Sequence, residues 1–150
     1  MTRERFASLV ASWFKPEPES GYNMSRMNDR SPTLVSWQWN GYPEFHADRR
    51  NLVLHLISWP WFVAGFFGVL SAPLAGSLVG IAVQLGFGVV AMALCMIVQG
   101  RGHAKEKSPP IPFSSRGDAF QRIFAEQLIN FPRFVLTGGL ARAWRATAQG

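Results

Sequence analysis

The feature that most constrains the fold is the stretch from Asn51 to Gly100, which contains no Asp, Glu, Lys or Arg. About 20 apolar residues form a helix long enough to cross a bilayer, so this stretch is long enough for two such helices. Pro73 and Gly76 interrupt it and predict a turn. We therefore expect an all-α membrane protein, a two-span helical hairpin with helices over about 52–70 and 78–99.

The composition supports a membrane partner and argues against nucleic acid. The chain of 150 residues is the size of a single domain, with 15 Lys+Arg against 9 Asp+Glu and 48% hydrophobic residues. Its basic residues lie toward the two ends instead of forming one stripe, which favours contact with the anionic cytoplasmic leaflet of a lipid bilayer. The only cysteine, Cys95, excludes an intrachain disulfide.

The distribution of positive charge predicts the orientation of the hairpin. Both outer flanks of the apolar stretch are basic and the connecting turn is not; the flanking residues are Arg49, Arg50, Arg101, Lys105 and Lys107. By the positive-inside rule, an integral membrane protein with both termini in the cytoplasm is expected. The spacing Gly76-x-x-x-Gly80 suggests close contact between the helices.

Amphipathic interfacial helices are expected at both ends of the chain. In the segment 1–41, an apolar stripe at helical spacing precedes a polar linker over 16–32; it consists of Phe6, Leu9, Val10, Trp13 and Phe14. In the segment 113–150, Asp118 is expected to cap a helix, with Gln121 completing a capping box, and Pro132 to kink or end it. This last segment contains too many charges to span a membrane, so we expect it to cover the cytoplasmic mouth of the central segment, 42–112.

Three histidines are expected at one membrane edge: His46, His55 and His103. His46 and His55 can converge only if the chain bends between them, most simply over 48–51. His103 lies about ten residues further from the turn than His55, roughly 15 Å along a helix. The second helix is therefore expected to end near Gly100 and fold back.

Three imidazoles are a typical ligand set for several transition metals, and they do not select one. Asn51 lies four residues before His55 on the same helix face and could orient its ring by a hydrogen bond. Extra ligands or hydrogen-bond acceptors could come from Glu44, Asp48 and Glu106. In the alternative reading, each histidine sits separately in the interface, bonded to a backbone carbonyl or a lipid phosphate.

The combined spacing resembles a membrane family. Its pattern here is His46-x4-Asn51-x3-His55-x4-Pro60, followed after the apolar stretch by Gly102-His103-x-x-Glu106-Lys107. It resembles the family typified by the yeast Fe(II)-dependent dioxygenase of phytosphingosine breakdown, and the stretch 124–139 looks like the tail of a bacterial branch.

The resemblance implies an oxidoreductase of lipid metabolism that carries out fatty acid α-oxidation, with a 2-hydroxy acyl lipid and O₂ as substrates. It further implies that His46, His55 and His103 bind Fe(II), with Asn51 and Glu106 supporting catalysis.

Two other readings stay open. One is an electron-transfer protein with a b-type haem held by His55 and His103. The other is a non-catalytic hairpin that packs into a larger membrane complex or against copies of itself. The sequence has no nucleophile–base pair, phosphate-binding loop or paired-cysteine motif, so hydrolase and nucleotide chemistry have no support.

Overall fold

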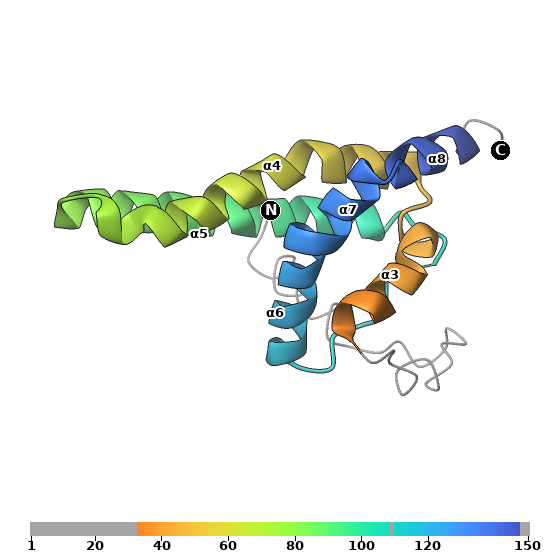
Figure 1. Ribbon diagram of the computed structural model, residues 1–150, viewed down its shortest axis with the longest axis horizontal. Helices are drawn as coiled ribbons and strands as arrows, with labels where there is room; N and C mark the ends of the chain where they lie inside the picture. Colours follow the sequence, from red (N-terminus) through yellow and green to blue (C-terminus); the bar gives the residue numbers. More distant parts are fainter. Residues whose placement is uncertain (1–32, 109, 148–150) are drawn as a thin grey trace, which may run out of the picture.

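The computed structural model describes residues 33–108 and 110–147, and every regular element in these residues is a helix (Figure 1). The amphipathic stripe and linker expected near the N-terminus lie outside the described residues. The elements are α3 (Leu34–Phe45), α4 (Arg49–Ser71), the 3₁₀ turn η1 (Ala72–Leu74), α5 (Leu78–His103), α6 (Arg116–Ala125), the π-helical turn η2 (Glu126–Asn130), α7 (Phe131–Leu136) and α8 (Gly139–Ala146).

Helices α4 and α5 lie antiparallel and pack closely along their length (Figure 1). Gly65 and Gly88 make this packing possible, because a Cβ on Gly65 would lie 2.7 Å from the carbonyl oxygen of Gly88 and a Cβ on Gly88 would lie 2.5 Å from that of Gly65. The expectation that Gly76 and Gly80 lie at the contact between the two helices was wrong. Gly76 has a φ of +67° and shapes the turn, and the atoms nearest a Cβ on Gly80 belong to Ala75 and Ser77.

The two arms of this helix pair have equal length, and no fold-back occurs at Gly100. The first arm runs on through η1, so the arms cover Arg49–Leu74 and Leu78–His103, 26 residues each. Pro73 does not end the first arm because it lies in the first turn of η1, where no intrahelical donor is needed. Helix α5 continues unbroken through Gly100 to His103.

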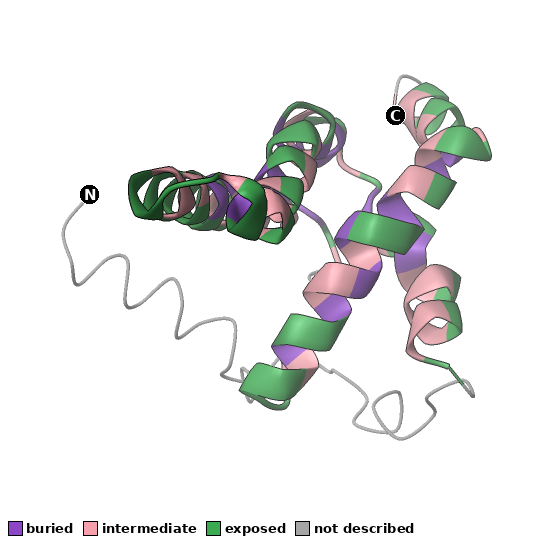
Figure 2. Cartoon of the chain, turned by 60° about the vertical axis from the view of Figure 1, so that its left-hand side comes forward, coloured by how far each residue is buried: buried purple, intermediate pink, exposed green. Residues whose placement is uncertain are grey.

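Both arms are long and apolar enough to cross a membrane, and they are mostly exposed. Only 28% and 17% of their most apolar windows are buried, unlike the core helices of a soluble protein. The free end of the pair is largely exposed (Figure 2), and its exposed large apolar residues include Phe67, Leu70, Leu74, Leu78, Val79 and Val83. These surfaces need an apolar environment.

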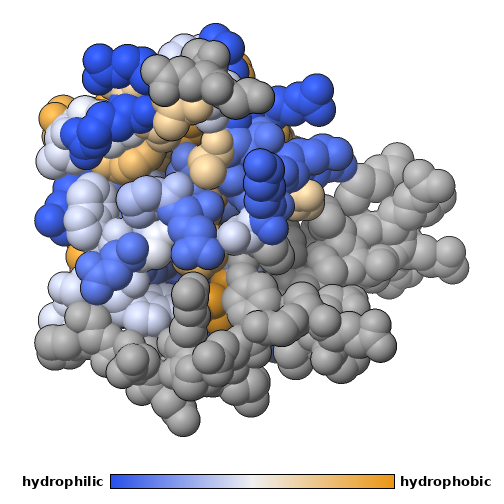
Figure 3. Space-filling view, turned by 90° about the vertical axis from the view of Figure 1, so that its right-hand side faces the viewer, coloured by the Kyte–Doolittle hydropathy of each residue, from blue (hydrophilic) through white to orange (hydrophobic). Residues whose placement is uncertain are grey.

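The remaining helices gather around the other end of the pair (Figure 1). Tyr42 of α3, Leu52 of α4 and the α7 residues Phe131 and Phe134 form a buried core that joins them. The outer surface at this end is largely hydrophilic (Figure 3). The molecule therefore has an apolar shaft and a packed head whose end face is largely hydrophilic, while Phe120 and Leu136 of the head are also exposed.

The C-terminal helices differ from the expectation in two places. Ser115, and not Asp118, caps α6: its hydroxyl accepts from the N–H of Asp118 at 3.1 Å, while the Asp118 carboxylate accepts from the N–H of Ser114 at 3.0 Å. Pro132 does not end the helix. The π turn before it lets the N–H of Phe131 reach the carbonyl of Glu126, and the chain stays helical to Leu136.

Candidate metal centre

His46 owes its position to the bend between α3 and α4. It is the C-cap of α3, with φ −133° and ψ 47°, and its side chain is only 2% exposed. Asp48 then starts α4 by accepting from the N–H groups of Arg50 and Asn51 at 2.7 and 3.2 Å. The bend lies directly before the predicted segment 48–51 and turns His46 back toward α4.

His55 and His103 meet across the helix pair. Side chains lean toward the N-terminus of their own helix. The side chain of His55 therefore leans toward the start of α4, and that of His103 leans back along α5, so the two approach each other. The Nε2 atoms of His55 and His103 lie 3.1 Å apart. The three imidazole rings, including that of His46, have centroids 4.7 to 5.0 Å apart and meet edge to face.

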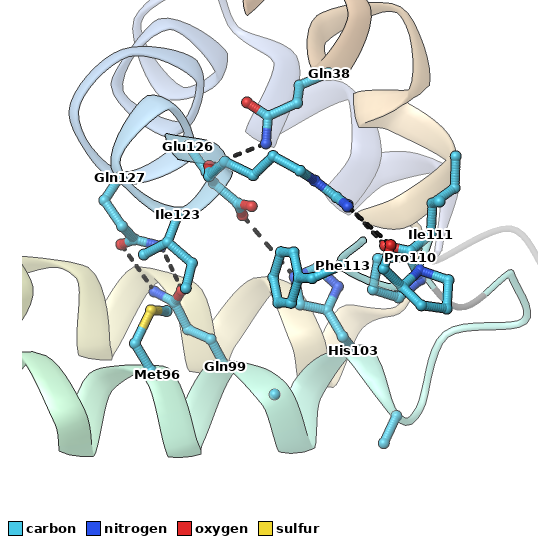
Figure 4. A pocket seen from close by; sticks show the side chains of 14 residues that line it. Gln38, Met96, Gln99, His103, Pro110, Ile111, Phe113, Ile123, Glu126 and Gln127 are labelled. Atoms are coloured by element: carbon cyan, nitrogen blue, oxygen red, sulfur yellow. Dashed lines mark hydrogen bonds and ion pairs between the residues drawn. The ribbon is translucent and has the colours of Figure 1, made fainter. Parts of the chain in front are cut away.

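A fourth donor, Glu126, completes the group from the first residue of the π turn. Its Oε1 lies 3.4 Å from Nε2 of His46, 3.8 Å from Nδ1 of His55 and 3.9 Å from Nε2 of His103. Figure 4 shows the carboxylate directed from the π turn η2 at His103 of α5. One donor atom from each of the four residues falls within 4.8 Å of all the others, so the group could hold a metal ion.

The hydrogen bonding of these residues fits a metal ion. His46 Nδ1 donates to the carbonyl of Tyr42 at 3.0 Å, which leaves the lone pair of Nε2 facing the group, as in many metal-binding histidines. Buried Nε2 of His46, Nδ1 of His55 and Oε1 of Glu126 accept no hydrogen bond from the described residues. Metal–ligand bonds of about 2.0–2.2 Å put neighbouring donors roughly 3–3.5 Å apart. The separations given above run from 3.1 to 3.9 Å, and all four donors lie within 4.8 Å of one another.

The electrostatics favour an ionised Glu126. Burial by itself would raise the pKa of its carboxyl, but the adjacent imidazoles of His103 and His46 outweigh burial and hold the pKa well below its usual range. Burial, and then the charge of Glu126, raise the pKa of the Tyr42 hydroxyl well above its ordinary value. The group therefore presents a carboxylate beside a neutral phenol.

Asn51 and Glu106 lie beside the group and brace it. Glu106 accepts from the N–H groups of Ala47 and Asp48 at 3.2 and 2.8 Å and from the side-chain amide of Asn51 at 2.6 Å. Asn51 also donates to the carbonyl of Phe45, so its amide does not orient His55 as expected. A Cβ on Gly102 would collide with Asn51, which shows how closely α5 approaches this brace.

The other carboxylates named from the sequence do not join the donor group. Asp48 is the N-cap of α4, and the side chain of Glu44 is exposed. Glu126 was missed because it is remote from the histidine motifs. One signal could have found it: Arg122, Glu126 and Asn130 are spaced by four, so these three polar groups share one face of the helical segment.

Comparison with protein-family models, characterised proteins and solved structures finds no match to this chain. Its chemistry must therefore be argued from the donor group and its surroundings.

Proposed function

We propose that the chain is a membrane-embedded non-haem iron dioxygenase that carries out α-oxidation of 2-hydroxy fatty acids or related acyl lipids. The observation that carries the proposal is the convergence of His46, His55, His103 and Glu126 at the head end of two apolar helices. Imidazole and carboxylate are the donors of non-haem Fe(II) oxygenases.

In this proposal the four side chains hold Fe(II), which supplies activation of O₂ and Lewis-acid binding of substrate oxygens. The protein keeps the ligand set ordered. Tyr42 fixes the tautomer of His46, and the brace of Asn51 and Glu106 ties the start of α4 to the end of α5. The carboxylate of Glu126 offsets part of the positive charge of the ion.

The membrane setting supports a lipid substrate. With both termini cytoplasmic, the exposed basic side chains of Arg49, Arg50 and Lys105 would lie at the headgroup level, close to the donor group. A 2-hydroxy acid could then place its carboxyl and hydroxyl groups at the centre while its tail remains in an apolar environment.

The haem alternative is less well supported by the geometry. Two axial imidazoles must lie on opposite faces of a flat macrocycle. Here the Nε2 atoms of His55 and His103 are 3.1 Å apart, with the ring of His46 and the carboxylate of Glu126 beside them. No specific contact favours a purely structural hairpin.

The test is metal analysis of anaerobically purified protein together with an assay for release of a fatty acid shortened by one carbon. Wild-type protein should contain about one iron per chain and turn over a 2-hydroxy fatty acid with O₂. His55→Ala should lose both at unchanged protein level, while Arg145→Ala, which alters an exposed residue of α8, should retain both. Full activity in His55→Ala would contradict the proposal, and a Soret band would favour the haem alternative.

A further inference from the structure

A cavity of about 260 Å³ opens from the donor group between α5 and α6 (Figure 4). Its lining includes His103 and Glu126 of the donor group and, further along α5, Met96. Met96 precedes His103 by seven residues on α5, which is two helical turns or about 10 Å. The cavity therefore leads from the donor group into the apolar shaft.

The walls of this cavity are suited to an apolar ligand. Side chains of Met96, Ile111, Phe113 and Ile123 line it, and Gly100 contributes no side chain between Met96 and His103. Flexible methionine and aromatic side chains adapt well to hydrocarbon.

Two polar residues of the wall, Gln99 and Gln127, are hydrogen-bonded to each other. The amides of Gln99 and Gln127 bond reciprocally, at 3.3 and 2.5 Å, and Gln99 also donates to the hydroxyl of Ser58 at 3.2 Å. The indole N–H of Trp59 donates to the backbone carbonyl of Gln127 at 2.7 Å. Because these two amides are already hydrogen-bonded to each other, a hydrocarbon chain beside them does not deprive them of a partner.

A second cavity, of about 390 Å³, reaches the same donor group from the α3 side. Its lining is more polar and includes Asn40, Glu44 and Tyr42, whose buried hydroxyl has no hydrogen-bond partner among the described residues. The two cavities share His103 and Glu126. A molecule with an apolar and a polar end could thus occupy both sides of the centre.

We infer that the cavity between α5 and α6 binds the aliphatic chain of an acyl lipid, with the polar end of the lipid at His103 and Glu126. The identity of that polar end, a 2-hydroxy carboxyl group, rests on the proposed function. The binding of the chain itself depends only on the cavity.

The test is photolabelling of the full chain in nanodiscs with a 2-hydroxy fatty acid that carries a diazirine at mid-chain, followed by mass spectrometry. Adducts should concentrate on the peptides that contain Met96 and Ile123, and an excess of unlabelled 2-hydroxy fatty acid should reduce them at least fivefold. Adducts spread over exposed shaft residues such as Val83 and Val90, without competition, would overturn the inference.

Two cavity-filling variants provide the control on position. Ile123→Trp and, from the opposite wall, Met96→Trp should each lower the competed adduct at least fivefold. Leu128→Trp adds the same bulk at an exposed position of the adjoining π turn and should leave it unchanged. Equal labelling in all three variants would place the chain elsewhere.

A final pair of measurements separates this inference from the proposed function. His55→Ala should lose its metal but keep the competed adduct, because His55 does not line the cavity. If wild-type protein gives competed adducts but never binds iron, the proposed function is refuted and the inference stands. If wild-type protein binds iron but gives no competed adducts, the inference is refuted and the proposed function stands. Competition by phosphatidylcholine and not by the free acid would assign the chain to a membrane lipid.

Discussion

Tyr42 and His46 are joined twice. Their rings stack with centroids 3.9 Å apart and planes 12° from parallel, and the backbone carbonyl of Tyr42 accepts the Nδ1 proton of His46 at 3.0 Å. The stacking fixes the plane of the imidazole and the hydrogen bond fixes its tautomer. A residue of α3 thus determines how a donor at the end of that helix faces the centre.

Two substitutions of Tyr42 should separate the effect of its ring from the effect of its hydroxyl. Tyr42→Phe keeps the stacking and the backbone carbonyl, so iron content should be unchanged, and loss of a buried, unpaired hydroxyl should stabilise the fold by about 1 kcal/mol. Tyr42→Ala should weaken metal binding about 10–100-fold, as loss of a residue that orients a ligand does. Metal titration and thermal unfolding measure both effects, and equal metal affinity in the two variants would contradict the role of stacking.

Glu126 and Glu106 should behave differently when each is changed to glutamine. Glu126→Gln removes a charged donor and should lower iron content with little change in the fold. Glu106→Gln places an amide group opposite two backbone N–H donors and should destabilise the fold by about 1–3 kcal/mol. Iron per folded chain, together with the midpoint of thermal unfolding, distinguishes a ligand from a brace; loss of iron only in Glu106→Gln would reverse the assignment.

Two glycines of the shaft form a matched pair. Gly65→Val forces α4 and α5 apart at the carbonyl of Gly88, and overpacking of this kind costs about 1–3 kcal/mol. Gly86→Val places its side chain where no atom lies within 4 Å and should leave the packing unchanged. Thermal unfolding in detergent should show a lower midpoint for Gly65→Val alone.

The raised pKa of Tyr42 predicts a late step in alkaline titration. The phenol keeps its proton in the folded chain at pH values where the unfolded chain has lost it, so the stability contributed by the neutral group is present below about pH 10 and declines above it. Ultraviolet absorbance of tyrosinate should therefore show a component well above pH 10. Tyr42→Phe should lack this component, and an unchanged titration curve would refute the assignment.

Several features of the fold and of the donor group could be predicted from the sequence. The uncharged stretch 51–100 identified both apolar helices, and the three histidines do converge. The bend that brings His46 toward His55 was expected almost where Asp48 caps α4. These features follow from local hydropathy and helix geometry, which the order of residues determines directly.

Other features depend on packing between remote segments. Pro73 does not end the first arm because it lies in the 3₁₀ turn, and α5 brings His103 beside His55 without a fold-back. Glu126 joins the group because the π turn before Pro132 directs it at the head of the pair. Neither outcome follows from residue spacing alone.

The four donors come from the end of α3, from α4, from α5 and from the π turn, so a bound ion would link segments from His46 to Glu126. An ion that binds only the folded chain stabilises it by mass action, and here it would also close the long loops between those segments. If that ion is the iron of the proposed function, cells starved of iron should degrade the protein faster, because less of the folded chain would be stabilised by the ion.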